Sequence, residues 1–193
     1  NILVIDCGIK NSQLRALLKR NVQLTVVDTY YKFVEEVFLK KYDGIFLSNG
    51  PGNPTDSAFV VEQLKTIFGS NLIIPVFGIC YGHQLIGLAS GNSIGKMKYG
   101  NRGHNIPCNL VGTNKCYITS QNHGFEVLLN KENNDNKWSE LFVNSNDGTN
   151  EGLIHSEKPF FSVQFHPEAR AGPTDTVFLF NIFLDRCRES FNV

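Results

Sequence analysis

The chain has 193 residues, with 18 basic and 18 acidic side chains and a formal net charge of zero. This length is enough for one domain with a substantial core. The charge balance and the scattered basic residues argue against a nucleic-acid partner. No apolar run reaches the roughly 20 residues that a membrane-spanning helix needs, so we expect no membrane partner.

The first 80 residues alternate between short apolar runs and stretches with helical spacing of apolar side chains. The apolar runs predict four strands, at Ile2–Ile5, Leu24–Val27, Gly44–Leu47 and Leu72–Phe77. The stretches between them predict three helices, at Leu14–Leu18, Phe33–Phe38 and Ala58–Phe68. Such alternation is typical of an α/β fold with a mostly parallel, open, twisted sheet and helices on both faces. Ligands of such sheets bind beyond the carboxyl ends of the strands.

The second half of the chain differs from the first in composition and in the pattern of its apolar residues. Gly91–Pro107 is rich in glycine and polar residues, and we expect strands and loops over one side of the sheet. Asn130–Glu140, which contains Trp138, is expected to be a mobile surface excursion. Val177–Leu184 is apolar around most of its circumference and predicts a closing helix buried on more than one side. Three shorter runs predict further strands, at Cys116–Thr119, Leu141–Val143 and Pro159–Gln164.

The five cysteines are odd in number and scattered along the chain, at Cys7, Cys80, Cys108, Cys116 and Cys187. No Cys-x-x-Cys or Cys/His cluster indicates zinc, and we expect no metal and no cofactor. The pattern favours a reducing compartment and a cytoplasmic location. The chain starts directly in an apparent core strand and shows no basic leader, so we expect one domain, residues 1–193, cut from a longer chain.

The stretch Gly78-Ile79-Cys80-Tyr81-Gly82 follows the fourth predicted strand and precedes a helical pattern. Strand, sharp turn and helix around Gly-x-nucleophile-x-Gly predict a nucleophile elbow. The glycines allow tight backbone angles and close packing. The helix N-terminus favours a thiolate at Cys80. Most free cysteines are only small buried hydrophobes, but the elbow context favours a nucleophile here.

The loop Ser48–Pro54 holds two glycines and two prolines after the third strand. It could be an ordinary strand-to-helix turn. Because we expect it beside the elbow, we assign its Gly52 N–H as one oxyanion donor. The N–H of Tyr81, directly after the nucleophile, would be the other.

His166 and Glu168 follow the last core strand and lie two positions apart, so an extended backbone points them to the same side. Glu168 can accept a hydrogen bond from one imidazole nitrogen and leave the other free for Cys80. The alternative is a loop histidine with purely structural partners. His83 could be structural, and a base role is disfavoured for the three that we expect in loops without matching acids, His104, His123 and His155.

The elbow and the His166-Pro167-Glu168 sequence together resemble the class I, or triad, glutamine amidotransferases. Six further segments resemble the glutaminase part of carbamoyl phosphate synthetases, and the match covers nearly the whole chain except Asn130–Glu140. These segments are Asp6–Lys10, Leu47–Pro54, Gly100–Asn105, Thr119–Phe125, Asn146–Thr149 and Ser162–Glu168. Gly100–Asn105 is more similar to the eukaryotic multifunctional form than to the separate bacterial small chain.

The resemblance implies that Cys80, His166 and Glu168 form a catalytic triad that hydrolyses glutamine through a thioester. Ammonia would pass to a carbamoyl phosphate synthetase domain or subunit, for pyrimidine or arginine synthesis. The positions that match the family's glutamine contacts are Gly50, Gly52, Tyr81, Gln84, Asn122, Gly124 and Phe125. Tyr81 stands where the family usually has leucine, which would alter the pocket mouth or its access. The family also has a separate amino-terminal domain, which residues 1–193 do not include, so we expect weak activity of this segment by itself.

Two alternatives remain at this point. The chain could be the glutaminase of another pathway, such as guanylate or anthranilate synthesis, although Gly100–Asn105 and Asn146–Thr149 argue against this. It could instead be a glutamine-binding or regulatory module with little turnover. A burst of thioester without steady turnover would indicate such a module.

Overall fold

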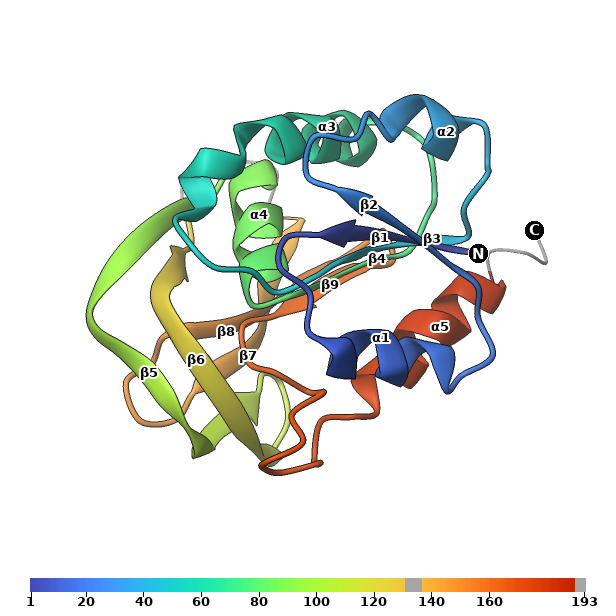
Figure 1. Ribbon diagram of the computed structural model, residues 1–193. Coiled ribbons are helices and arrows are strands. Elements are labelled where there is room, and N and C mark those ends of the chain that lie inside the picture. Colours follow the sequence, from blue (N-terminus) through green and yellow to red (C-terminus); the bar gives the residue numbers. More distant parts are fainter. Residues whose placement is uncertain (131–136, 190–193) are drawn as a thin grey trace.

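One mixed sheet of nine strands forms the centre of the part of the chain that the structure, a computed structural model, describes: residues 1–130 and 137–189 (Figure 1). The strand order is β2-β1-β3-β4-β9-β8-β7-β5-β6. The strands are β1 (Ile2–Asp6), β2 (Leu24–Asp28), β3 (Gly44–Leu47), β4 (Val76–Ile79), β5 (Ser93–Leu110), β6 (Cys116–Leu128), β7 (Trp138–Asn144), β8 (Asn150–His155) and β9 (Phe160–Val163). The helices are α1 (Asn11–Leu18), α2 (Val34–Phe38), the 3₁₀ helix η1 (Pro54–Ser57), α3 (Ala58–Gly69), α4 (Tyr81–Ala89) and α5 (Leu179–Glu189).

The parallel half of the sheet consists of β2, β1, β3, β4 and β9. Along β1, side chains alternate between two cores because successive residues of a strand point to opposite faces. Leu3 and Ile5 belong to the core that α2, α3 and α4 cover. Ile2 and Val4 belong to the core that α1 and α5 cover. The expected helices on both faces are therefore confirmed, and Figure 1 shows them as two layers.

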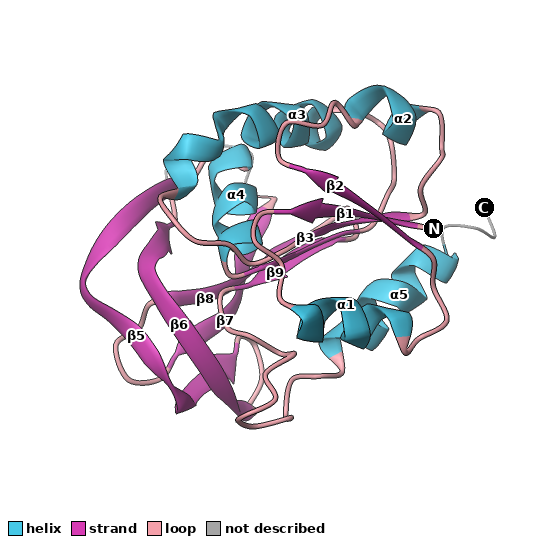
Figure 2. Ribbon diagram, in the orientation of Figure 1, coloured by secondary structure: helices cyan, strands magenta, loops and turns pink. Residues whose placement is uncertain are grey.

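The antiparallel half consists of β8, β7, β5 and β6, and its long strands β5 and β6 curl away from the parallel strands (Figure 2). Their pairing is interrupted by register shifts between Lys96 and Asn101 and between Gly103 and Ile106. The expectation of strand structure in Gly91–Pro107 is confirmed by β5, but its placement over one side of the sheet was wrong. This segment continues the sheet itself by pairing antiparallel with β6.

Two further expectations need correction. The strand predicted at Leu72–Phe77 runs instead from Val76 to Ile79, because Pro75 has no N–H to donate to a sheet ladder. The surface excursion predicted at Asn130–Glu140 ends earlier, since β7 begins at Trp138. The indole of Trp138 packs against the rings of Phe68 and Phe160. Residues 131–136 of that prediction lie outside the described part.

The helix predicted at Val177–Leu184 is observed as α5, two residues later at its start and longer at its end. Its Phe180 and Phe183 are fully buried against the sheet, but Ile182 is exposed, so the expectation of burial on more than one side was wrong and one face alone is covered. Among the described helices, none combines the length and the apolar character that crossing a bilayer would require.

We expect Phe77→Ala to lower the free energy of unfolding by about 3–5 kcal/mol, because it opens a cavity in this core. The Phe77 ring stacks on Phe161, with centroids 4.4 Å apart, and meets Phe46, Phe180 and Phe183 at 5.7–5.8 Å. The control is Phe59→Ala on α3, where the ring is 41% exposed and the loss should stay below about 1 kcal/mol. Urea unfolding measures the free energy of unfolding of both variants. Equal losses of this free energy in Phe77→Ala and Phe59→Ala would contradict the assigned core.

Candidate active site

Cys80 occupies a strained turn between β4 and α4. Its backbone has φ 56° and ψ −99°, values that non-glycine residues adopt only when their surroundings impose them. The Cys80 N–H donates to the carbonyl oxygen of Val163 on β9 at 2.8 Å. Helix α4 begins at the next residue, so the thiol stands at the positive end of the helix dipole. This is the geometry of a nucleophile elbow.

Close packing explains the glycines on either side of Cys80. A β-carbon on Gly82 would lie 2.3 Å from the carbonyl oxygen of Leu47, at the end of β3. A β-carbon on Gly78 would lie 2.7 Å from the carbonyl of Gly82. Real β-carbons do not approach other atoms so closely, so larger residues would push the elbow away from β3.

The loop after β9 carries His166 and Glu168 to Cys80. The strand ends at Val163, one residue earlier than predicted. The backbone N–H of His166 donates to the carbonyl oxygen of Ser120 on β6 at 2.8 Å. The Nδ1 of His166 lies 2.8 Å from Oε1 of Glu168, and both side chains are buried. Because Nδ1 faces Glu168, Nε2 is the nitrogen left for the Cys80 thiol, which is near enough to help raise the pKa of the imidazole.

Opposing influences set the charge of this pair. Burial favours a neutral imidazole, but the hydrogen bonds with Cys80 and Glu168, and their charges, raise the pKa of His166 to about 9. Burial also favours a neutral Glu168, which would raise the pKa of this carboxyl. The hydrogen bond and charge of His166 outweigh burial and hold the pKa of Glu168 below its usual value. His166 therefore carries a proton at neutral pH and can pass it to a group beside Cys80.

Helix α1 and the residue before it add two residues that the sequence did not reveal as part of the site. The Nε2 of the fully buried Gln13 donates to Oε1 of Glu168 at 3.1 Å. The Nζ of Lys10 lies 3.5 Å from Nδ1 of His166, and its charge also lowers the pKa of Glu168. A possible signal was the polar Gln13 one helical turn before the buried Leu17.

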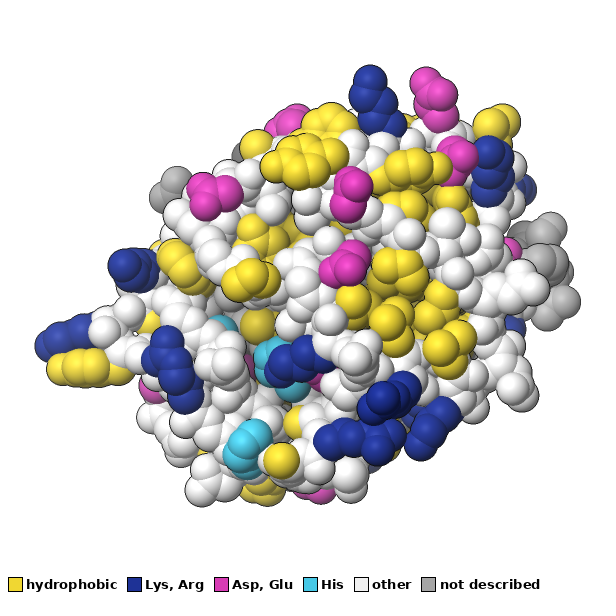
Figure 3. Space-filling model, viewed as in Figure 1, with side chains coloured by type: hydrophobic (Ala, Val, Ile, Leu, Met, Phe, Trp, Pro, Cys, Tyr) yellow, Lys and Arg dark blue, Asp and Glu magenta, His cyan; other side chains and the backbone are white. Residues whose placement is uncertain are grey.

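A cavity of about 450 Å³ lies beside Cys80. It is bordered by all seven residues expected to hold the substrate: Gly50, Gly52, Tyr81, Gln84, Asn122, Gly124 and Phe125. The cations Lys96, Lys98 and Arg102 of β5 also line it. On the face of the molecule that Figure 3 shows, histidine side chains reach the surface near the middle, beside a Lys or Arg side chain. The structure thus brings these residues together, while their contacts with a substrate stay a prediction.

Hydrogen bonds hold the wall of this cavity in place. The Nε2 of Gln84 donates to the carbonyl oxygen of Phe125 at 3.2 Å and to Oε1 of Gln164 at 3.0 Å. This leaves the Oε1 of Gln84 able to accept a hydrogen bond from a ligand. Also on β6, the carbonyl oxygen of Asn122 lies 4.0 Å from the Cys80 sulfur.

The family model "Glutamine amidotransferase class-I" matches residues 3–186 of the chain. The chain belongs to this family. It is 53% identical over 189 residues to the multifunctional protein ura1 of Schizosaccharomyces pombe, a match that covers 98% of this chain and 8% of that protein. It is 50% identical over 185 residues to the carbamoyl phosphate synthase arginine-specific small chain of Candida albicans, covering 96% of this chain and 42% of the relative.

The fold is shared with solved structures of lower sequence similarity. A GMP synthase protein from Thermoplasma acidophilum superposes with a TM-score of 0.80. The match covers 99% of this chain and 95% of that one, at 22% identity. This likeness supports the amidotransferase fold alone.

In this amidotransferase, the side chain of Tyr81 points into the protein. Its ring is 5% exposed and belongs to the core beneath α3 and α4. Its hydroxyl lies 2.8 Å from Oγ of Ser57 and 3.1 Å from the carbonyl oxygen of Asn53. Most of the ring therefore packs between the elbow and the loop that follows β3, and an effect on access to the cavity stays a prediction.

The other histidines differ in part from the sequence expectation. His83 is fully buried with Nδ1 2.9 Å from Oγ of Ser162, and burial lowers its pKa to about 3, consistent with a structural role. The placement of His104, His123 and His155 in loops was wrong, because they lie in β5, β6 and β8. His123 also has an acid: its Nε2 lies 3.4 Å from Oε1 of the buried Glu151. The sequence could not show this long-range pair.

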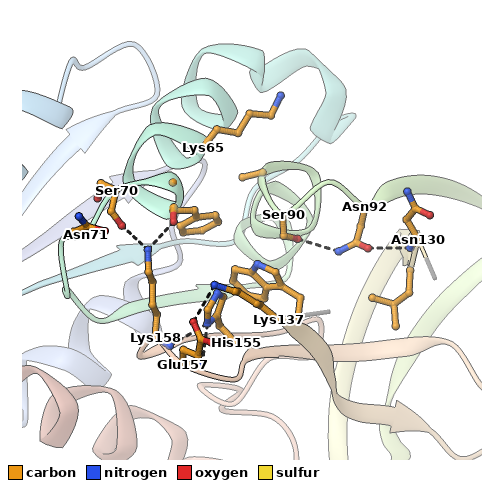
Figure 4. Close-up of a pocket in the computed structure, with 15 residues that line it drawn as sticks. Lys65, Ser70, Asn71, Ser90, Asn92, Asn130, Lys137, His155, Glu157 and Lys158 are labelled. Carbon is orange, nitrogen blue, oxygen red and sulfur yellow. Dashed lines mark hydrogen bonds and ion pairs between the residues drawn. The ribbon is translucent and has the colours of Figure 1, made fainter. Parts of the chain in front are cut away.

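A larger cavity of about 670 Å³ lies at the far ends of α3 and α4 (Figure 4). Cys80 is at the start of α4, so this cavity is remote from the elbow. The Nζ of Lys158 donates to the carbonyl oxygens of Phe68 and Ser70 at 2.7 and 2.6 Å, and Lys137 pairs with Glu157 at 3.0 Å. Its described lining residues include no cysteine, so it does not fit the amidotransferase nucleophile.

We expect the imidazole of His166 to titrate with a pKa of about 9 in the free protein. NMR on protein labelled with ¹⁵N-histidine measures this value. Glu168→Gln should lower it, because the variant removes the carboxylate charge. A wild-type midpoint near the ordinary value of about 6.5 would contradict the described pair.

This raised pKa also predicts a pH-dependent stability. The protonated His166 stabilises the folded state fully below its unfolded pKa of about 6.5, and the contribution is lost as the pH rises through about 9. The difference in unfolding free energy between the wild type and His166→Asn should therefore be larger at pH 6 than at pH 9.5.

Proposed function

We propose that this chain hydrolyses L-glutamine to glutamate and ammonia, with Cys80 as nucleophile, His166 as acid and base, and Glu168 as the group that orients His166. The supporting observation is the buried His166–Glu168 pair beside a cysteine on a nucleophile elbow, a neighbour that helps raise the pKa of His166. The cavity beside that cysteine offers the residues expected to hold glutamine.

The first half of the reaction forms a thioester. His166 already holds the proton that Cys80 gives up, so imidazolium and thiolate form an ion pair, and the thiolate attacks the side-chain amide carbon of glutamine. A sulfur–carbon bond forms while the carbonyl electrons move to oxygen. The N–H groups of Gly52 and Tyr81 stabilise this oxyanion, each by about 2.7–4 kcal/mol. His166 then donates its proton to the amide nitrogen, and the carbon–nitrogen bond breaks. Ammonia departs, and a γ-glutamyl thioester remains on Cys80.

The second half regenerates the thiol. His166 removes a proton from water, which attacks the thioester carbonyl carbon. The carbon–sulfur bond breaks, glutamate leaves, and the sulfur recovers its proton from His166. This scheme uses side chains and backbone groups of the chain and calls for no metal or cofactor.

We further propose that the ammonia is consumed by a carbamoyl phosphate synthetase domain or subunit, in pyrimidine or arginine synthesis. The chain spans 8% of the S. pombe multifunctional protein and 42% of the C. albicans small chain, so it corresponds to one part of a larger machine. Direct transfer would preserve ammonia as a nucleophile, which protonation in bulk water would remove. Scattered free cysteines support a cytoplasmic location, and the proposal includes no nucleic-acid or membrane partner.

We expect Cys80→Ser to abolish glutamine hydrolysis and His166→Ala to reduce it by at least about a thousandfold, because nucleophile and base act as one unit. Ammonia release and mass spectrometry of the γ-glutamyl adduct are the measurements, with circular dichroism to confirm folding. Near-normal turnover in either variant would contradict the assignment of Cys80 as nucleophile and His166 as base. A wild type that forms the adduct without steady turnover would indicate a glutamine-binding module instead.

The synthetase partner should raise the rate of glutamine hydrolysis, since the chain is part of a larger assembly in its relatives. We expect ammonia release from glutamine to increase when a carbamoyl phosphate synthetase chain is added, and carbamoyl phosphate to form with glutamine as nitrogen source. Cys80→Ser is the control, because it should leave synthesis from free ammonia intact. Equal hydrolysis with and without the partner would argue against the coupling.

A further inference from the structure

The phenol of Tyr81 connects the two backbone segments that carry the proposed oxyanion donors. Tyr81 begins α4, directly after Cys80. Its hydroxyl can donate to the carbonyl oxygen of Asn53 at 3.1 Å and accept from Oγ of Ser57 at 2.8 Å. Asn53 follows Gly52 directly, so the hydroxyl ties the elbow to the residue next to the second donor.

Gly52 needs such an anchor because of its own backbone. Its φ of 95° lies in a region that glycine adopts freely, and a β-carbon there would meet open space among the described residues. Packing at Gly52 itself therefore does little to fix the direction of its N–H. On one side the loop is held at Gly50, where a β-carbon would lie 2.1 Å from the carbonyl oxygen of Cys7. On the other side it is held at Asn53 and Ser57 by Tyr81.

We propose that the Tyr81 hydroxyl is a positioning group that keeps the Gly52 N–H and the Tyr81 N–H aimed at one point beside Cys80. This inference rests on the proposed glutaminase function. The hydroxyl does not touch the reacting atoms; it acts through the loop at Asn53 and Ser57. Burial raises the pKa of Tyr81 above its ordinary value, so the phenol keeps its proton at neutral pH.

The test is Tyr81→Phe, which removes the hydroxyl and keeps the ring. The matched control is Tyr42→Phe: Tyr42 is also buried, at 8% exposure, and its hydroxyl donates to Oε2 of Glu36 at 2.7 Å. Tyr42 precedes β3, at the opposite end of that strand from the Ser48–Pro54 loop. Both variants lose one buried hydroxyl, but only Tyr81→Phe loosens the proposed oxyanion hole.

We expect Tyr81→Phe to lower kcat for glutamine hydrolysis about tenfold, with KM within about threefold of the wild type, because a loosened donor affects the transition state more than the bound substrate. Tyr42→Phe should leave both constants unchanged. A γ-aldehyde analogue of glutamine, which adds the Cys80 sulfur to form a tetrahedral adduct, should lose affinity by about the same factor as kcat.

An unchanged kcat in folded Tyr81→Phe would overturn the inference, as would a rise in KM alone. If Tyr81→Phe fails to fold, Ser57→Ala is the test variant, because it removes one partner of the Tyr81 hydroxyl and leaves the core intact. A two- to threefold fall in kcat would support the proposal, and an unchanged kcat would overturn it. A wild type that does not hydrolyse glutamine, alone or with its synthetase, would instead refute the proposed function itself.

Discussion

The Cys80 sulfur is held in place by the contact between the backbone of Gly82 and the end of β3. The carbonyl oxygen of Leu47 leaves no room for a β-carbon at Gly82, and the N–H of Gly82 donates to the carbonyl oxygen of Ser48 at 3.0 Å. These contacts press the elbow against the start of the Ser48–Pro54 loop. Cys80, two residues before Gly82, has a positive φ, and the surrounding packing offsets that strain.

Strand β9 joins this elbow to the rest of the site. It pairs in parallel with β4 and antiparallel with β8, so it marks the boundary between the two halves of the sheet. Its Val163 carbonyl accepts from Cys80, and the loop beyond it presents His166, which is anchored to Ser120 of β6. The nucleophile and the Gly52 loop thus come from the parallel half, whereas the wall at Asn122 and Phe125 comes from the antiparallel half.

Features with local causes could be predicted from the sequence. Continuous apolar runs showed the strands of the parallel half, and the glycines around Cys80 showed the elbow. The pairing of His166 with Glu168 followed from their spacing after a core strand, and it is observed at 2.8 Å. The assignment of Cys80, His166 and Glu168 to catalysis, and of the cavity residues to glutamine, remains a prediction with this geometry in its support.

Features that depend on contacts between distant parts of the chain could not be predicted from the sequence. Gln13 meets Glu168 across 155 positions, and His123 meets Glu151 only because β6 lies near β8 in the folded sheet. The continuity of β5 was hidden by its glycines and exposed polar side chains, which resemble a loop. Tyr81 was noted as a departure from the family's leucine, but its hydroxyl partners are set by tertiary packing.

The most direct measurement is a crystal structure of the protein flash-cooled after brief exposure to glutamine. We expect continuous density from the Cys80 sulfur to a γ-glutamyl carbonyl carbon, with the carbonyl oxygen within hydrogen-bonding distance of the N–H groups of Gly52 and Tyr81. An unmodified Cys80 with glutamine bound at another place, or a γ-glutamyl group on a different residue, would contradict the proposed site.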